Sequence, residues 1–262
     1  INMENIINKR LETIGEDVMG FLNEIQLKYP DSISLASGRP DEKYFNMEHL
    51  MEYYNIYIDF LQNSQGKKRE TILNELGQYN RTKGIVNELA AKYLKNDENI
   101  DVDPKSLLIT VGSQEALVIA ITTLCNIETD AIFVENPTYV GLTHFAKIMG
   151  YYVEPVEMTF DGISLDSLEE KILQVSTKGK KIKLLYVIPD YQNPLGASMS
   201  IDKRRKLLIL AEKYNFYILE DNAYREFSYE GESIGSLKSM DINKRVIYIG
   251  SFSKILFPSL RL

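Results

Sequence analysis

The sequence has few of the residues that build disulfides and metal sites. Cys125 is its only cysteine, so no internal disulfide can form, and a reducing compartment is expected. The two histidines, His49 and His144, are far apart in the chain and have no carboxylate or cysteine neighbours at ligand spacing. We therefore expect no metal site.

Long apolar runs and blocks of basic charge are also missing. Runs such as 116–124 are far shorter than the roughly 20 residues that a membrane-spanning helix needs. The first residues lack the basic-then-apolar pattern of a signal peptide. The formal net charge is −7 at pH 7, and no basic block could follow a nucleic-acid backbone. We expect a cytoplasmic protein that contacts neither membrane nor nucleic acid through this segment.

The 262 residues are 44% hydrophobic and 26% charged, which is typical of a globular protein with a sizeable core. Helical patterns are expected over 4–28 and about 47–61, and another helix after Gly84. From residue 105, β-rich runs alternate with helical patterns at 113–126, 138–149, 165–175 and 201–214. The expected strands are Leu107–Val111, Ala131–Glu135, Tyr151–Val156, Ile182–Ile188, Phe216–Glu220 and Val246–Ile249. This alternation predicts an α/β domain with a mostly parallel sheet and helices on both faces, after an N-terminal helical segment.

Polar residues follow five of these six expected strands, where ligands of such sheets bind. The 107–111 run leads into Gly112, Ser113 and Gln114 at a helix start, whose free N–H groups suit an anion. Tyr139 follows the second strand, where its ring could cover a flat ligand. Asn193 follows the fourth, in an Asn-Pro bend. Each of these features alone also fits an ordinary role as a helix cap, a packed ring or a turn.

Two charged residues follow the last two strands. Asp221 closes a hydrophobic strand, and a carboxylate there needs a partner such as a protonated ring nitrogen or a lysine, although a purely structural role fits it equally well. Lys254 lies among apolar and small residues, so desolvation would prepare its amine as a nucleophile. Ser251, Ser253 and Arg261 near it supply donors for a dianion. Together, these strand-end residues include every part that pyridoxal phosphate (PLP) needs.

The chain resembles the PLP enzymes of fold type I, in the class I/II aminotransferase family. It is most similar to the branch with 2-aminoadipate and kynurenine aminotransferases and the effector domains of MocR-type regulators. The resemblance runs from about residue 33 to the end. It is carried by Ser251-Phe252-Ser253-Lys254 with Pro258 and Arg261, by Asn193-Pro194-Leu195-Gly196, by Asp221 through Tyr224, and by Gly112-Ser113-Gln114.

The resemblance implies roles for these residues. Lys254 would hold PLP as a Schiff base and move the proton between Cα and C4′. Asp221 would pair with the pyridine nitrogen, while Asn193 and Tyr224 would hydrogen-bond the phenolic oxygen and Tyr139 would stack on the ring. The other implied cofactor contacts are Gly112, Ser113, Gln114, Ser251, Ser253 and Arg261, with Tyr79 reaching the phosphate of the neighbouring subunit in a homodimer. Gly38 and Arg39 are candidates for substrate contacts.

The same resemblance implies a domain division. Residues 1–45 would form an N-terminal helix and substrate-side segment, and residues 46–262 the PLP-binding large domain. A small C-terminal domain with the arginine that binds the substrate carboxylate would follow residue 262. This segment alone is therefore expected to be incomplete as an enzyme.

The implied function is an aminotransferase of amino acid metabolism, which moves an amino group from an amino acid to a 2-oxo acid. The residues that hold the cofactor are shared by PLP enzymes of elimination, racemisation and oxidation, so these reactions remain open. A non-enzymatic alternative is the ligand-sensing domain of a MocR-type transcription regulator. That alternative requires a winged-helix domain upstream of Ile1.

Overall fold

The computed structural model describes residues 9–13, 18–33, 38, 40–229 and 234–261. The chain divides into two compact units. One comprises residues 1–38 and 111–262, and the other residues 39–110.

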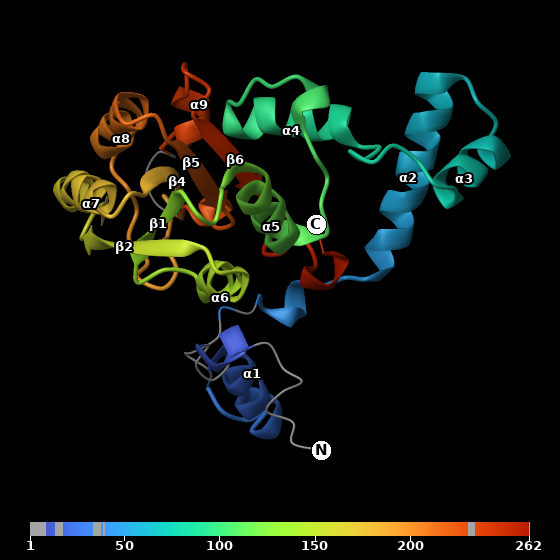
Figure 1. Ribbon diagram of the computed structural model, residues 1–262. Helices are drawn as coiled ribbons and strands as arrows, with labels where there is room; N and C mark the ends of the chain where they lie inside the picture. The colour runs from blue at the N-terminus through green and yellow to red at the C-terminus, as the bar shows by residue number, and fades with distance from the viewer. Residues whose placement is uncertain (1–8, 14–17, 34–37, 39, 230–233, 262) are drawn as a thin grey trace. The chain divides into compact units, whose positions relative to one another are not determined.

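The first unit contains a six-stranded sheet in the order β3-β2-β1-β4-β5-β6 (Figure 1). Its strands are β1 (Asp130–Asn136), β2 (Tyr152–Thr159), β3 (Gly162–Ile163), β4 (Lys181–Val187), β5 (Tyr217–Asn222) and β6 (Val246–Gly250). All pair in parallel except β2 with β3. The strand order reverses between β1 and β4, so the carboxyl ends of these two strands flank the position where ligands bind in such sheets.

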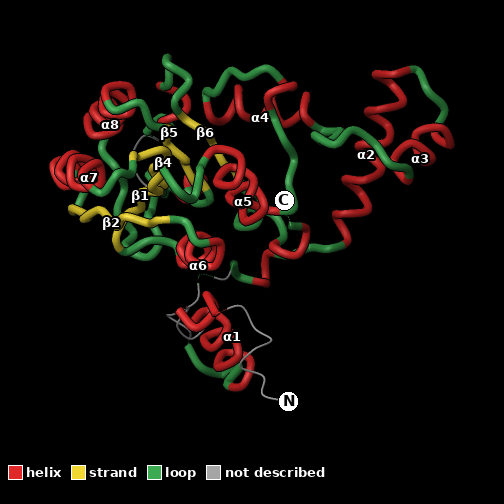
Figure 2. The backbone as a smooth tube through the Cα atoms, viewed as in Figure 1, coloured by secondary structure: helices red, strands yellow, loops and turns green. Residues whose placement is uncertain are grey.

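Helices cover both faces of this sheet. They are α5 (Gly112–Leu124), α6 (Val140–Met149), α7 (Leu165–Thr177), α8 (Ile201–Lys213) and α9 (Leu237–Met240). The unit also contains α1 (Val18–Lys28) and the short 3-10 turns η2 (Lys9–Thr13), η5 (Arg225–Phe227) and η6 (Pro258–Leu260). Figure 2 shows the strands of this unit lying together between its helices. The α/β class with a mostly parallel sheet and helices on both faces is confirmed.

The two faces follow from the alternation of apolar side chains along each strand. In β1, Ala131 and Phe133 pack with α7 and α8, whereas Ile132 and Val134 pack with α5 and α6. Strands buried on both faces read as continuous apolar runs, and this is why the sequence pattern located them well.

The second unit is helical among its described residues. It contains η3 (Glu42–Tyr44), α2 (Glu48–Gln65), α3 (Arg69–Gly77), α4 (Asn87–Glu98) and η4 (Pro104–Ser106). The helices expected at about 47–61 and after Gly84 are confirmed as α2 and α4. Helix α3 was not predicted, because it is short and buries only Ile72.

Two expected elements need correction. No strand forms at Leu107–Val111, so that prediction is wrong: the Ile109 N–H bonds to the Lys83 carbonyl at 2.9 Å, and Leu108 is exposed. A β-rich run becomes a strand only beside another strand, and a single backbone hydrogen bond to Lys83 does not provide one. Of the helix expected over 4–28, the described residues form η2 and α1, and residues 1–8 and 14–17 lie outside them.

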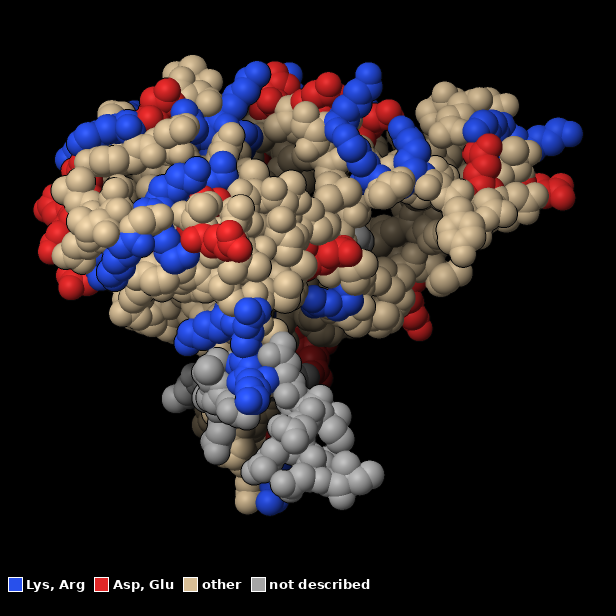
Figure 3. Space-filling view, viewed as in Figure 1, with Lys and Arg blue, Asp and Glu red and all other residues tan. Residues whose placement is uncertain are grey.

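Charged side chains of both signs are interspersed over the sheet-containing unit on the face seen in Figure 3. No helix in the described ranges is both long and apolar enough to cross a bilayer. Among those same residues, no cluster of three or more His, Cys, Asp or Glu side chains could hold a metal ion.

Candidate functional site

Asp221 occupies the centre of the candidate site. It lies in β5 and is 6% exposed. The Tyr186 hydroxyl, on the neighbouring strand β4, donates a hydrogen bond of 2.7 Å to Asp221 Oδ2. Asp221 Oδ1 is buried and has no hydrogen-bond partner among the described residues. Burial raises the pKa of Asp221 to about 6, and the bond from Tyr186 acts in the opposite direction. The free oxygen therefore needs a donor, preferably a cationic one.

Tyr139 lies at the start of α6, close to this carboxylate. Its ring packs directly on Gly141, where an added Cβ would come within 2.5 Å of the ring. Its hydroxyl donates to Gln114 Oε1 at 3.4 Å. Burial raises the pKa of Tyr139, the charge of Asp221 raises it further, and Arg261 lowers it. The ring thus lies within electrostatic range of both charged groups.

Asn193 and Tyr224 form a pair of polar side chains. Asn193 Nδ2 donates to the Tyr224 hydroxyl at 3.2 Å. Burial raises the pKa of Tyr224, the bond from Asn193 lowers it, and Asp221 and Tyr139 raise it. The structure therefore brings together four residues that the sequence placed at three separate strand ends.

A buried ion pair holds the loop that carries Asn193. Arg204 in α8 is fully buried, and its Nη1 and Nη2 donate to the two carboxylate oxygens of Asp190 at 3.2 and 2.5 Å. The same guanidinium also donates to the carbonyls of Pro189, Met199 and Gly235. This anchor fixes the loop on both sides of its turn.

The start of α5 and the end of the chain meet at Gly112. Its φ is +75°, and an added Cβ would lie 2.8 Å from Arg261 Nη2. The guanidinium of Arg261 therefore packs against the first residue of α5, next to Ser113 and Gln114. In the segment after β6, the Ser253 N–H donates to Ser251 Oγ at 3.2 Å. A helix start with a serine at its second residue and a guanidinium beside it suits a phosphate.

Lys254 lies in the same segment. Burial lowers the pKa of its amine, as the apolar flanks predicted. Its Nζ donates to the Gly38 carbonyl at 2.8 Å. Gly38 thus contacts Lys254 through its backbone carbonyl, whereas Arg39 lies outside the described residues.

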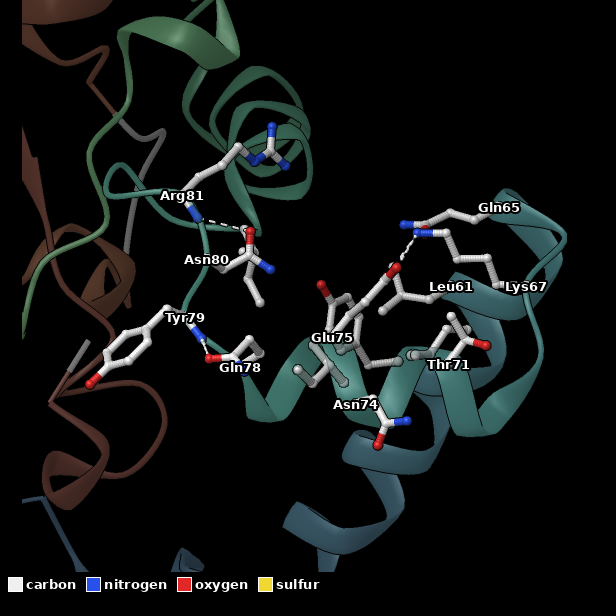
Figure 4. A pocket seen from close by; sticks show the side chains of 14 residues that line it. Leu61, Gln65, Lys67, Thr71, Asn74, Glu75, Gln78, Tyr79, Asn80 and Arg81 are labelled. Carbon is white, nitrogen blue, oxygen red and sulfur yellow. Dashed lines mark hydrogen bonds and ion pairs between the residues drawn. The ribbon is translucent and has the colours of Figure 1, made fainter.

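Tyr79 belongs to the 39–110 unit and is fully exposed. That unit contains a pocket of about 710 Å³ between α2, α3 and the segment 78–81, with the Lys67–Glu75 ion pair at 2.7 Å on its wall. Figure 4 shows the Tyr79 ring pointing away from the side chains of α2 and α3. Tyr79 is the only expected cofactor residue among the side chains that line this pocket.

The sequence interpretation missed four side chains that organise the site: Glu135, Tyr186, Gln192 and Arg204. Glu135 and Gln192 stood inside the strand-end motifs, and the alternation of β4 would have placed Tyr186 on one face of the sheet with Leu184 and Ile188. The sequence places Arg204 on a helix but gives no sign that it pairs with Asp190. What Asp221, Tyr139, Asn193 and Tyr224 can do chemically follows from their groups: a buried carboxylate, an aromatic ring and two polar side chains suit a flat cationic ring.

Comparisons with known proteins agree with this geometry. The family model of aminotransferase class I and II matches residues 35–257. A (S)-3,5-dihydroxyphenylglycine transaminase of Amycolatopsis orientalis is 40% identical over 243 residues, which are 93% of this chain and 55% of that protein. The chain thus spans about half the length of this curated relative.

Two solved structures are similar as well. An archaeal alanine:glyoxylate aminotransferase superposes with a TM-score of 0.83 at 33% identity, over 100% of this chain and 63% of that one. The kynurenine aminotransferase of Pyrococcus horikoshii, in complex with PMP, gives a TM-score of 0.80 at 32% identity, over 99% and 61% of the two chains. The resemblance seen in the motifs is therefore confirmed at the level of sequence and fold.

Proposed function

Because this chain belongs to the class I and II aminotransferase family, we propose that it is the PLP-binding part of an aminotransferase, which moves an amino group from an amino acid to a 2-oxo acid. PLP is the cofactor that the family implies, and it supplies the electron sink for the reaction when bound. One observation carries the proposal most directly. Asp221 presents a buried carboxylate oxygen without a partner, beside a tyrosine ring and a pair of polar donors.

The residues present fit this cofactor. Asp221 Oδ1 would accept a hydrogen bond from the protonated pyridine nitrogen, and the cation would return the carboxyl pKa toward its ordinary range. Asn193 and Tyr224 would donate to the phenolic oxygen, and the Tyr139 ring would cover the ring face. Gly112, Ser113, Gln114, Ser251, Ser253 and Arg261 would bind the phosphate, in keeping with the contact between Gly112 and Arg261.

Lys254 would act as nucleophile and then as the proton carrier. A lowered pKa increases the fraction of its amine that is neutral, which is the form that attacks an aldehyde. The Gly38 carbonyl would keep the ammonium in place when Lys254 is not joined to the cofactor. Gly38 and Arg39 remain proposed as substrate contacts.

The first experiment is an absorption spectrum of the protein that contains this chain, with PLP added. We expect a visible band that borohydride removes and that Lys254→Ala lacks. A matched control is Lys147→Ala, at the end of α6 and outside the expected site. A visible band of equal strength in Lys254→Ala would refute the role of this lysine.

The reaction type needs a second experiment, because elimination, racemisation and oxidation use the same cofactor contacts. A single turnover with an amino acid and no 2-oxo acid should leave pyridoxamine phosphate on the protein. Release of a 2-oxo acid without pyridoxamine phosphate would favour elimination or oxidation, and recovery of the enantiomer of the amino acid would favour racemisation. A winged-helix segment encoded upstream would favour the MocR-type regulator.

We also propose that the protein is a homodimer. Within each chain, we propose an N-terminal segment of residues 1–45, a PLP-binding domain of residues 46–262 and a further small domain after residue 262. Full exposure of Tyr79 supports the dimer, because an exposed tyrosine is free to reach a second subunit. Light scattering measures the mass of the assembly and so tests the dimer. Tyr79→Phe should weaken PLP binding and leave this mass unchanged. We propose a cytoplasmic location because the chain has a single cysteine. We propose that this segment does not contact nucleic acid because its net charge is negative.

A further inference from the structure

Gln192 connects the ends of two neighbouring strands through every polar atom of its side chain. Its Nε2 donates to Glu135 Oε2 at 3.1 Å and to the Pro137 carbonyl at 2.8 Å. Its Oε1 accepts the N–H of Leu195 at 3.0 Å. Gln192 is 1% exposed, so no water competes for these bonds. A buried amide with both donors and its acceptor occupied fixes the distance between the groups it joins.

The groups it joins are neighbours of expected cofactor contacts. Pro137 stands two residues before Tyr139, and Leu195 two residues after Asn193. The backbone of Gln192 also closes the Asn193 turn: its N–H donates to the Ala197 carbonyl at 2.8 Å, and its carbonyl accepts from the Gly196 N–H at 2.6 Å. A shift of this amide would therefore move Tyr139 and Asn193 relative to each other.

Glu135 completes the connection as an acceptor. Its Oε2 also accepts a hydrogen bond from the N–H of Ile188 at 3.1 Å, while Oε1 is buried and has no partner within the described part of the chain. Burial raises the pKa of Glu135 to about 8, and the nearby charge of Asp221 contributes in the same direction. At neutral pH Glu135 is thus mainly uncharged, and it leaves Asp221 as the negative group of the site.

We propose that Gln192 is a positioning residue, which sets Asn193 and Tyr139 in register around the cofactor by tying the end of β1 to the loop after β4. Arg204 and Asp190 hold this loop from the α8 side, and Gln192 holds it from the β1 side. The inference rests on the proposed function, because Asn193 is assigned to the phenolic oxygen of PLP there.

This role makes a spectroscopic prediction that loss of packing alone does not. A donor to the phenolic oxygen favours its deprotonated form, so it lowers the pH at which the visible band of bound PLP changes. If Gln192 no longer holds Asn193, that midpoint should rise by about one pH unit, the equivalent of one hydrogen bond to a charged group. PLP should bind about tenfold more weakly, which is 1.4 kcal/mol.

The test compares Gln192→Met with Asn87→Leu in the protein that contains this chain. Each variant replaces a buried amide with an apolar side chain of similar size. Asn87 Nδ2 likewise donates to two acceptors, the carbonyls of Lys83 and Leu107, but it is outside the expected site. Both variants should lower the melting temperature. Only Gln192→Met should shift the spectral midpoint and weaken PLP binding.

The outcomes separate the two proposals. An unchanged midpoint and PLP affinity in Gln192→Met, with a normal visible band in the wild type, would overturn the positioning role alone. A wild type without any visible band would overturn the proposed function. Where Gln192→Met does not fold, Gln192→Asn takes its place: it keeps a buried amide but shortens its reach by one methylene, and the same rise of the midpoint is expected.

Discussion

The Tyr186 hydroxyl donates to Asp221 Oδ2 at 2.7 Å, and both side chains are buried between the sheet and the α5–α6 layer. This bond occupies one carboxylate oxygen, and the other, Oδ1, accepts no hydrogen bond from the residues that the structure describes. Burial raises the pKa of Asp221 to about 6, and the bond from Tyr186 lowers it. Tyr186 therefore helps to keep Asp221 ionised at neutral pH.

Tyr186→Phe should weaken PLP binding. Without the hydroxyl, the pKa of Asp221 rises further above 6, and a larger fraction of the carboxyl is neutral at pH 7. A hydrogen bond to a charged group is worth about 1.5–3 kcal/mol, so the dissociation constant of PLP should rise about tenfold or more. The measurement is a spectral titration with PLP at pH 7 and pH 8.5, and the defect should be smaller at the higher pH.

A matched control for this variant is Tyr214→Phe. The Tyr214 hydroxyl also donates to a carboxylate, Glu169 Oε1, at 2.7 Å, in the α7–α8 layer on the other face of the sheet. Its removal should leave PLP binding unchanged. Equal PLP affinity in Tyr186→Phe and Tyr214→Phe would contradict the role of Tyr186.

Asp221→Ala should lose activity more completely than it loses the cofactor. In its proposed role the carboxylate would keep the pyridine nitrogen protonated, and loss of one partner from a buried ion pair costs about 3–5 kcal/mol. The phosphate contacts and Lys254 remain, so PLP still binds. We expect kcat/KM to fall at least about a hundredfold, since each 1.4 kcal/mol is a factor of ten. Asp221→Asn, which keeps the shape, should behave alike. Turnover near the wild-type rate would remove Asp221 from its assigned role.

Much of this architecture was readable from the sequence because strands buried on both faces form continuous apolar runs. Five of the six predicted strands formed within a few residues of their expected bounds, and the polar residues after them meet at one edge of the sheet. The strand expected at Leu107–Val111 did not form, because propensity alone provides no neighbouring strand to pair with.

The internal connections of the site were not readable in the same way. Gln192 bonds to Glu135 across 57 residues, and Tyr186 bonds to Asp221 across 35. Such contacts depend on strand order, which places β4 between β1 and β5. A single sequence specifies the polar residues at strand ends but not which strands become neighbours.

Gly112→Ala should weaken PLP binding by way of the phosphate. Gly112 has a φ of +75°, and its new Cβ would lie 2.8 Å from Arg261 Nη2, so the guanidinium must move. Gly179→Ala is a matched control, because Gly179 has a φ of +72° with no atom within 4 Å of the added Cβ. Both should lose about 1 kcal/mol of stability from backbone strain.

Only Gly112→Ala should also affect the ligand. Its affinity for PLP should fall more than its affinity for pyridoxal, which lacks the phosphate, and spectral titrations with both compounds give the ratio. Gly112→Ala could keep the wild-type ratio of PLP affinity to pyridoxal affinity while losing as much stability as Gly179→Ala. That result would show that Arg261 does not bind the phosphate.

Glu135→Gln should change how stability depends on pH. Burial raises the pKa of Glu135 from an ordinary 4.5 to about 8. The folded protein therefore binds this proton more tightly than the unfolded chain does. The resulting stabilisation is complete below pH 4.5 and is lost as pH rises toward 8, by at most about 1.4 kcal/mol per pH unit. Glutamine has the shape of the neutral acid, keeps an acceptor for Ile188 and Gln192, and has no such loss.

The difference in the free energy of unfolding, variant minus wild type, should hence rise between pH 5 and 8 and stay level above pH 8. Urea unfolding of the PLP-free proteins at several pH values measures it, and contributions common to both proteins cancel in the difference. Glu220→Gln is the control on the other face of the sheet. Burial raises the pKa of Glu220 to about 7. For Glu220→Gln, the difference in the free energy of unfolding should therefore become level about one pH unit lower than for Glu135→Gln. Parallel stability curves for Glu135→Gln and the wild type would mean that Glu135 is ionised in the folded protein, and that Asp221 shares its surroundings with a second negative charge.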